Sequence, residues 1–265
     1  MGILPAVSDA QTLILADKLV HASIIDGIRL STARCIRFRH NDLVQLERLL
    51  EQHHATFRQL IIVTESIFSM DGDQADLTAL VRLKKRYSNV LLYVDEAHAF
   101  GVRGPRGLGC AEETGCIRDI DFLVGTFGKA AASAGAYIAC CRTIREYLVN
   151  RMRTSSSPRH CSDKYCLDTV YRTETCQNAG PPRASGRISR TLREALQAKG
   201  YGCPSASHIV PLIIGPVPTP CCVQSCCRGM GSMHCRCARP RCRRDITYPL
   251  LADSGHYRTR DRRNN

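Results

Sequence analysis

The sequence lacks several features that would assign it to common protein classes. None of its apolar runs approaches membrane-spanning length, and its N-terminus has no charged leader followed by an apolar stretch. It also has no Gly-x-x-x-x-Gly-Lys-Ser/Thr loop of the kind that cradles nucleotide phosphates. We therefore expect a soluble cytoplasmic protein that neither contacts a membrane nor uses a phosphate-binding loop.

Cysteine and positive charge are abundant but unevenly distributed. The 265 residues have a net charge of +13, yet residues 1–154 hold 19 basic and 17 acidic side chains, whereas residues 155–265 hold 18 and 7. Only 5 of the 16 cysteines precede position 155. Such a tail would ordinarily indicate nucleic-acid or metal binding. Its cysteines have no paired Cys-x-x-Cys spacing of a structural zinc site, so we expect no metal and only nonspecific binding of nucleic acid.

The first part of the chain alternates between two hydrophobic patterns. Apolar runs of strand length alternate with segments whose apolar residues recur at helical spacing. This succession predicts an α/β fold with a mostly parallel sheet flanked by helices. The expected strands lie at 12–16, 35–39, 60–64, 90–94, about 121–126 and 134–140, and the expected helices at 21–30, 42–50, 76–87 and 143–153.

Two of the expected strands end in residues that can carry chemistry. Asp95 follows the strand at 90–94, and Lys129 follows Gly125 and Gly128, which leave room around its amine. A lysine in this setting could form a Schiff base, and an aspartate could pair with a protonated ring nitrogen. Taken singly, the alternatives of a solvated loop lysine and a helix N-cap would be favoured. Ligands of parallel sheets bind at this carboxyl edge.

Several ordered motifs together resemble one family over about residues 3–154. The chain is similar to the α-oxoamine synthases, pyridoxal-phosphate enzymes of the type I aminotransferase fold, and within them to the 8-amino-7-oxononanoate synthases. The matching segments are Asp17–Gly27, Arg39–Asp42, Thr64–Asp73, Val94–His98 and Gly125–Ala130.

The resemblance implies a cofactor, pyridoxal 5'-phosphate, and a role for six residues. Lys129 would hold the cofactor and then move a proton at the α-carbon of the amino acid, while Asp95 would keep the pyridine nitrogen protonated. His98 would hydrogen-bond the ring oxygen and His21 would stack on the ring. Ser69 and Thr126 would complete the cofactor cradle.

The implied reaction is the condensation of L-alanine with a pimeloyl thioester, on CoA or a carrier protein, with loss of carbon dioxide. The intact family forms homodimers. Alternatives are the glycine-using 2-amino-3-ketobutyrate ligase, serine palmitoyltransferase, and an inactive remnant of such an enzyme. The segment Val94-Asp-Glu-Ala-His98 also has the residue pattern of the metal-binding strand of a helicase. A helicase needs a phosphate-binding loop upstream, and the sequence contains none.

The resemblance stops at Thr154. Removing one nucleotide from a possible coding sequence for the family's Phe-Ile-Phe-Ser-Thr-Ala-Leu yields Ser-Ser-Ser-Pro-Arg-His-Cys, as residues 155–161 read. We therefore expect residues 155–187 and 221–265 to be out of frame and poorly ordered, and residues 188–220 to be a remnant of a disrupted C-terminal small domain. In the family, the loop that binds the cofactor phosphate comes just before the position that matches Met1, so this loop is absent. With this loop and most of the small domain compromised, we expect impaired activity.

Overall fold

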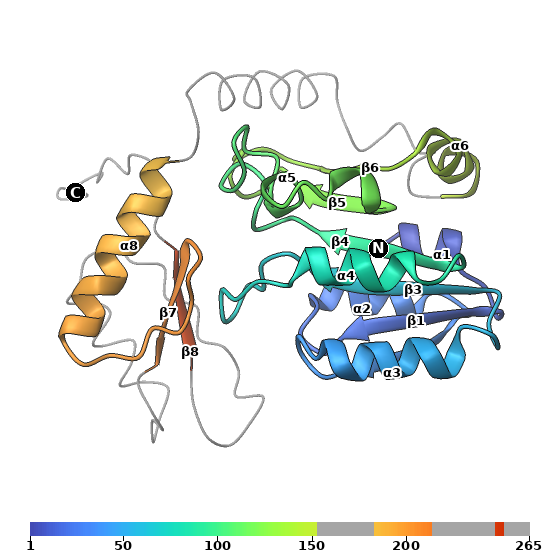
Figure 1. The fold of residues 1–265 in the computed structure, drawn as a ribbon. Coiled ribbons are helices and arrows are strands. Elements are labelled where there is room, and N and C mark those ends of the chain that lie inside the picture. The colour runs from blue at the N-terminus through green and yellow to red at the C-terminus, as the bar shows by residue number, and fades with distance from the viewer. Residues whose placement is uncertain (153–182, 214–246, 252–265) are drawn as a thin grey trace, which may run out of the picture. The chain divides into compact units, whose positions relative to one another are not determined.

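A computed structural model describes residues 1–152, 183–213 and 247–251 (Figure 1). The chain divides into two compact units. The first contains Met1–Ser69 and Asp73–Pro182, and the second contains Met70–Gly72 and Arg183–Asn265. Most of the segments predicted to be out of frame, and the cysteines from Cys221 to Cys242, lie outside the described residues.

The first unit is built on a six-stranded sheet with the strand order β2-β1-β3-β4-β5-β6. Strands β1 to β5 are parallel to their neighbours, and β6 runs antiparallel to β5. The predicted α/β class and mostly parallel sheet are confirmed. The strands are β1 Thr12–Asp17, β2 Arg34–Phe38, β3 Gln59–Glu65, β4 Val90–Asp95, β5 Phe122–Thr126 and β6 Ala136–Ala139.

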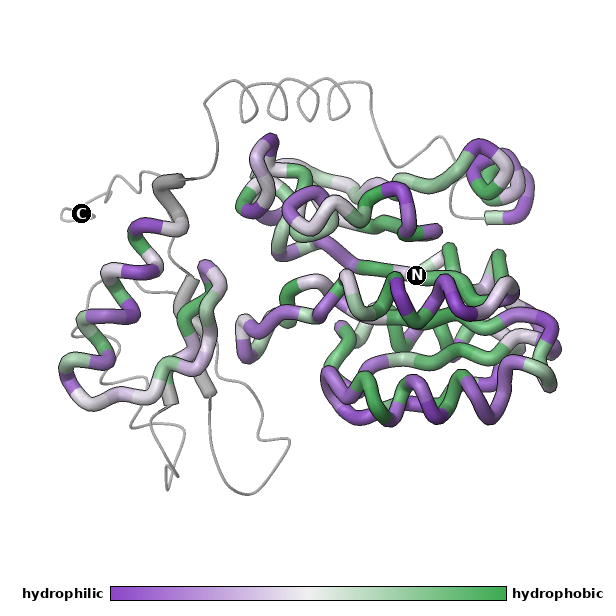
Figure 2. The backbone as a smooth tube through the Cα atoms, in the orientation of Figure 1, coloured by the Kyte–Doolittle hydropathy of each residue, from purple (hydrophilic) through white to green (hydrophobic). Residues whose placement is uncertain are grey.

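Helices cover both faces of this sheet, which explains why its central strands read as continuous apolar runs. All six residues of β1 are buried, and β3 is buried from its second residue onward. Figure 2 shows these hydrophobic strands between helices in which hydrophilic and hydrophobic residues alternate along the chain. Successive strand residues face opposite sides, so Ile61 and Leu60 pack into different layers.

One core lies between the sheet and helices α1 Ile3–Val7, α2 Ala22–Arg29 and α6 Arg142–Arg151. Ile24, Ile28 and Leu148 pack there against Ile14 and Ile61 of the central strands. Helices α3 Leu43–His53 and α4 Leu77–Lys85 lie side by side and bury Leu46, Leu50 and Leu80, among others. The predicted helices are thus confirmed with small shifts of their ends.

Side-chain caps begin three of these helices, as their sequences suggest. His21 caps α2, Asp42 caps α3 and Asp76 caps α4, each by accepting a backbone N–H bond. The short helices α5 Cys110–Glu113 and η1 Ile117–Asp119 were not predicted. The carboxylate of Glu96 accepts bonds from the first two α5 amides, a long-range contact that no local pattern reveals.

The second unit contains helix α8 Arg183–Ala198 and the antiparallel strands β7 Ile209–Ile213 and β8 Thr247–Leu251. Arg193 of α8 donates a hydrogen bond to the Ser207 carbonyl oxygen just before β7. Strand β8 falls in the segment 221–265, where we expected no regular structure, so the expectation differs from the structure at these five residues. No helix in the described ranges is long and apolar enough to cross a membrane.

Candidate active site

Four strands of the first unit end in polar residues at one edge of the sheet. Asp17 ends β1, Glu65 ends β3, Asp95 ends β4 and Thr126 ends β5. Glu65 and Asp95 are register partners on neighbouring parallel strands. Parallel strands deliver their carboxyl ends to the same edge, where ligands of open α/β sheets bind. The structure thus gathers three acidic side chains and a hydroxyl at the edge that the sequence predicts as the site.

Asp95 is half-buried and lies within electrostatic reach of Lys129 and His21. Burial raises the pKa of its carboxyl, while a hydrogen bond from the Ala97 amide and the positive charges of Lys129 and His21 act in the opposite direction. Its Oδ1 accepts that bond at 2.8 Å. This bond closes a turn, and no helix begins at Asp95, so the structure does not support the alternative reading of Asp95 as a helix N-cap.

Lys129 lies in the segment after β5, where the charges of Asp95 and Glu65 act on it. Desolvation lowers the pKa of its amine, and the negative charges of Asp95 and Glu65 raise it. Much of the residue's surface is still exposed, so the surrounding protein removes only part of the water from the amine. A lysine whose pKa is lowered has a larger neutral fraction, which is the form that attacks a carbonyl carbon.

The segment that carries Lys129 is closed by its own hydrogen bonds. Thr126 Oγ1 donates to the Gly135 carbonyl oxygen at 3.1 Å and accepts from the Gly128 amide at 3.2 Å. The Ala132 amide donates to the Lys129 carbonyl oxygen at 2.9 Å. Thr126, predicted to touch the cofactor, therefore also shapes the turn that presents Lys129.

The glycine-rich stretch after β4 lies against this segment. Gly101 has a φ of +76°, and a Cβ built on it would lie 2.5 Å from the Cβ of Ala130. The rings of Phe100, Phe127 and Tyr137 pack together beside it, with centroids 5.2 to 5.9 Å apart. This aromatic cluster braces the loop next to Lys129.

Glu65 is a site residue that the sequence reading missed. Its side chain is buried, and its Oε1 accepts a hydrogen bond of 2.5 Å from the backbone N–H of His21. Burial, followed by the charge of Asp95, raises its pKa to about 8. The available signal was its position, since it ends a buried strand just as Asp95 does.

The structure brings three of the six predicted site residues into one cluster. Lys129, Asp95 and His21 form one electrostatic cluster, together with Glu65. Ser69 and His98 lie in the turns that follow β3 and β4, both partly exposed at the same edge. The roles of all six toward a cofactor stay predictions.

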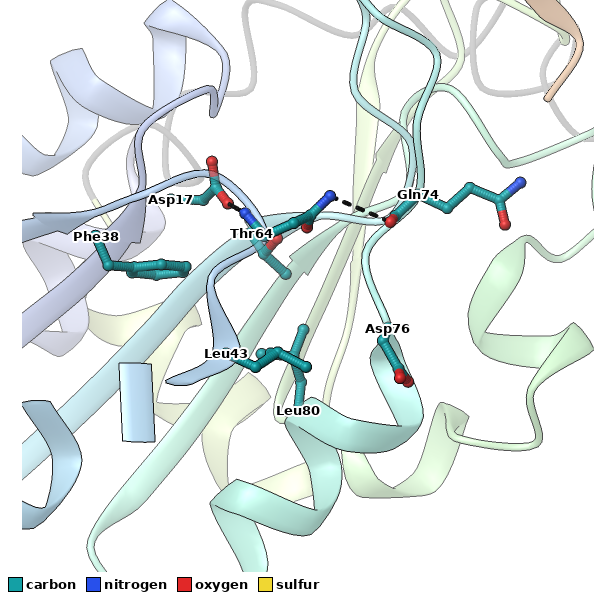
Figure 3. A pocket seen from close by; sticks show the side chains of 8 residues that line it. Asp17, Phe38, Leu43, Thr64, Gln74, Asp76 and Leu80 are labelled. Atoms are coloured by element: carbon teal, nitrogen blue, oxygen red, sulfur yellow. Dashed lines mark hydrogen bonds between the residues drawn. The ribbon is translucent and has the colours of Figure 1, made fainter. Parts of the chain in front are cut away.

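A separate small pocket lies beside this cluster and contains none of the six predicted residues. Its volume is about 120 Å³. Asn41 bridges two of the lining residues, because its backbone N–H donates to Asp17 Oδ2 and its Nδ2 donates to the Gln74 carbonyl oxygen. Figure 3 shows Asp17, Gln74 and Leu80 among the side chains around the pocket. The lining residues are Asp17, Phe38, Asn41, Leu43, Thr64, Gln74, Asp76 and Leu80.

His40 lies next to this pocket and joins two carboxylates. Its Nδ1 is 2.9 Å from Asp17 Oδ1, and its Nε2 is 2.5 Å from Asp73 Oδ2. Burial alone would lower the pKa of the imidazole, but the hydrogen bonds to Asp17 and Asp73 raise it to about 10. The protonated ring thus ties the segment after β3 to the end of β1.

Known proteins of the same kind share both the sequence and the fold. The chain is 50% identical over 220 residues to the 8-amino-7-oxononanoate synthase of Haemophilus ducreyi. This match covers 81% of this chain and 57% of that protein. The chain spans about half the length of the curated relatives that it matches, from 40% to 57%.

Solved structures give the same result. The serine palmitoyltransferase of Sphingomonas wittichii matches with a TM-score of 0.85 and 28% identity, over 96% of this chain and 65% of that one. The 8-amino-7-oxononanoate synthase of Francisella tularensis matches with a TM-score of 0.77 and 25% identity, over 96% and 74%. The family model described as aminotransferase class I and II matches residues 2–219. This chain therefore belongs to the aminotransferase class I and II family.

Proposed function

We propose that this chain carries the cofactor-binding part of a pyridoxal-phosphate-dependent C-acyltransferase of the 8-amino-7-oxononanoate synthase type. Its substrates would be L-alanine and a pimeloyl thioester on CoA or a carrier protein, with carbon dioxide released. The observation that carries the proposal is the placement of Asp95 at the carboxyl end of β4, at the same edge of the sheet as the turn with Lys129, where the two charges act on each other. The identity of 50% to a synthase of this name supports the choice of reaction.

The described residues fit this cofactor. Pyridoxal phosphate supplies a protonated pyridine ring that accepts electrons from a carbon next to its imine. The buried side of the site offers a carboxylate, Asp95, for the ring nitrogen, and Lys129 offers an amine for the aldehyde. His21, His98, Ser69 and Thr126 lie around the same edge as candidate partners of the ring and its oxygen.

In this proposal each residue has a defined physical task. Asp95 keeps a negative charge where its neighbours favour it, which holds a proton on the ring nitrogen. Lys129 would hold the cofactor through its amine, and the same amine would move a proton at the α-carbon of the amino acid. His21 would cover one face of the ring and limit the access of water.

The same site is compatible with a second amino acid substrate. The match to a serine palmitoyltransferase at 28% identity favours L-serine with a long-chain acyl thioester as the second candidate. We also propose a cytoplasmic location and a homodimer, both carried over from the resemblance. Comparing L-alanine with L-serine, each with its acyl-CoA, would separate the two reactions.

The direct test adds pyridoxal phosphate to the purified chain. We expect a new visible absorbance band, and after borohydride reduction a pyridoxyl group on the peptide that contains Lys129. Lys129→Ala should lose both signals. Lys85→Ala is the matched control, because this lysine lies on α4 in an exposed ion pair with Asp119 and should leave both signals unchanged.

The outcomes separate an enzyme from a remnant. Specific labelling of Lys129 together with carbon dioxide release from L-alanine and pimeloyl-CoA supports the full proposal. Specific labelling without turnover of either amino acid indicates an inactive remnant. Labelling spread over several lysines, unchanged by Lys129→Ala, would refute the proposed cofactor site.

A further inference from the structure

Glu65 is a buried carboxylate that the proposed reaction does not use. Its side chain lies at the end of β3, is 4% exposed and faces Asp95, its register partner at the end of β4. Two carboxylates side by side in a largely dry environment repel each other, so they need a compensating proton or cation. The amine of Lys129 is within electrostatic reach of both.

The same carboxylate also holds the backbone in front of helix α2. Its Oε1 accepts the hydrogen bond of 2.5 Å from the N–H of His21, across 44 positions of sequence. The His21 ring in turn begins α2, because its Nδ1 accepts a bond from the Ser23 amide at 3.2 Å. Glu65 therefore links the strand that ends beside Lys129 to the residue proposed to stack on the cofactor.

Three charged side chains and one backbone amide, from four parts of the fold, act on Glu65. These are Asp95 from β4, Lys129 from the segment after β5, Asp17 from β1, and the backbone dipole at His21. Asp95 and Asp17 favour its protonated form, whereas Lys129 and the His21 amide favour its ionised form. A group balanced in this way can hold a proton next to Lys129 near neutral pH.

We propose that Glu65 is a positioning residue of this site, which anchors the His21 backbone and sets the charge balance around the Lys129 amine. Its meaning for catalysis rests on the proposed function, but its two physical effects do not. Both can be measured on the chain without any added cofactor. Failure of this inference is thus distinguishable from failure of the proposed function.

Two substitutions separate the anchor from the charge. Glu65→Gln keeps an oxygen that can accept the His21 N–H bond but removes the negative charge. Glu65→Leu has a similar volume and removes both. Glu96→Gln is the control, because Glu96 is equally buried one residue beyond β4 but bonds to Ser66 and the α5 amides.

The effect of the Glu65 charge is measured on the amine of Lys129. Its pKa is measured by the pH dependence of acetic-anhydride labelling, followed by mass spectrometry of the Lys129 peptide. We expect Glu65→Gln to lower this pKa by about one unit, because an attracting negative charge is lost. Glu96→Gln should change it much less. No shift in Glu65→Gln, or an equal shift in Glu96→Gln, would overturn the charge role.

The anchoring of the His21 backbone by Glu65 is tested by the rate of amide hydrogen exchange in the peptide that spans residues 18–25. We expect exchange at least about tenfold faster in Glu65→Leu, the change that corresponds to 1.4 kcal/mol of lost protection. Exchange in Glu65→Gln should stay near the wild-type rate. If Glu65→Leu does not fold, the comparison of Glu65→Gln with wild type still decides the charge role. Equal exchange in wild type and both variants contradicts the anchor.

Discussion

Gly125 and Tyr137 are register partners on β5 and β6, and the Tyr137 ring occupies the space that a side chain at position 125 would need. A Cβ on Gly125 would lie 2.5 Å from both Cε1 and Oη of that ring. The ring cannot retreat freely, because it packs against Phe100 and Phe127. This contact connects the stability of the sheet to the segment that presents Lys129.

We expect Gly125→Ala to lower the free energy of unfolding by about 1–3 kcal/mol, as overpacking does in other cores. Urea unfolding followed by circular dichroism measures it. Gly128→Ala in the same hairpin is the control, since its nearest neighbour would be 3.6 Å from the added Cβ. Equal losses in the two variants would mean that the Tyr137 contact does not limit position 125.

Gly101 provides a test of the contact between the two loops beside the site. Gly101→Ala would force a Cβ against Ala130 in addition to the strain of a positive φ. Gly115→Ala is a close control, because its φ is +70° and nothing lies within 4 Å of its added Cβ. We expect both variants to lose about 1 kcal/mol of stability from backbone strain.

Only Gly101→Ala should also change the labelling of Lys129, because only it displaces the neighbouring residue. Acetic-anhydride labelling at fixed pH would show this as an altered rate at Lys129 and an unaltered rate at Lys85. An unchanged Lys129 rate in Gly101→Ala would show that the loop adapts without moving the amine.

The pKa of His40 predicts a pH dependence of stability. The folded state raises this pKa to about 10 from an ordinary value of about 6.5, so folding favours the protonated ring. The resulting stabilisation is fully present below about pH 6.5 and is lost as the pH rises through about 10. His40→Gln should therefore cost about 2 kcal/mol at pH 6 and progressively less towards pH 10.

The measurement is urea unfolding of wild type and His40→Gln across this range, with the difference plotted against pH. His53→Gln on α3 is the control, since among the described residues its side chain has no hydrogen bond to a carboxylate. A difference for His40→Gln that stays constant with pH would show that the ring contributes by packing, as its edge contact with Phe68 would suggest.

Asp95→Asn tests the second half of the proposed cofactor site. The amide oxygen can still accept the Ala97 N–H bond, so the turn should persist while the charge is lost. We expect the dissociation constant for pyridoxal phosphate to rise at least about tenfold, which corresponds to 1.4 kcal/mol. Titration followed by absorbance measures it, with the half-buried Asp119, which pairs with Lys85, changed to Asn as the control. An unchanged dissociation constant would remove Asp95 from the site.

Much of this molecule is determined by local patterns in the sequence. Apolar runs and helical spacing are enough to place β1, β3, β4 and the helices between them, because burial on both faces leaves a signal within each segment. The same reading places Asp95 at the end of a strand and Lys129 in a glycine-containing turn. The ordered motifs, taken together, indicated the family.

Only the tertiary structure determined which side chains meet. The bond from His21 to Glu65 spans 44 positions and the bond from His40 to Asp73 spans 33, so neither leaves a trace in the spacing of nearby residues. Glu96 beneath α5 and the Tyr137 ring above Gly125 are of the same kind. A local pattern records which face of an element is buried, whereas the partner of a buried polar group depends on how distant strands are brought into register.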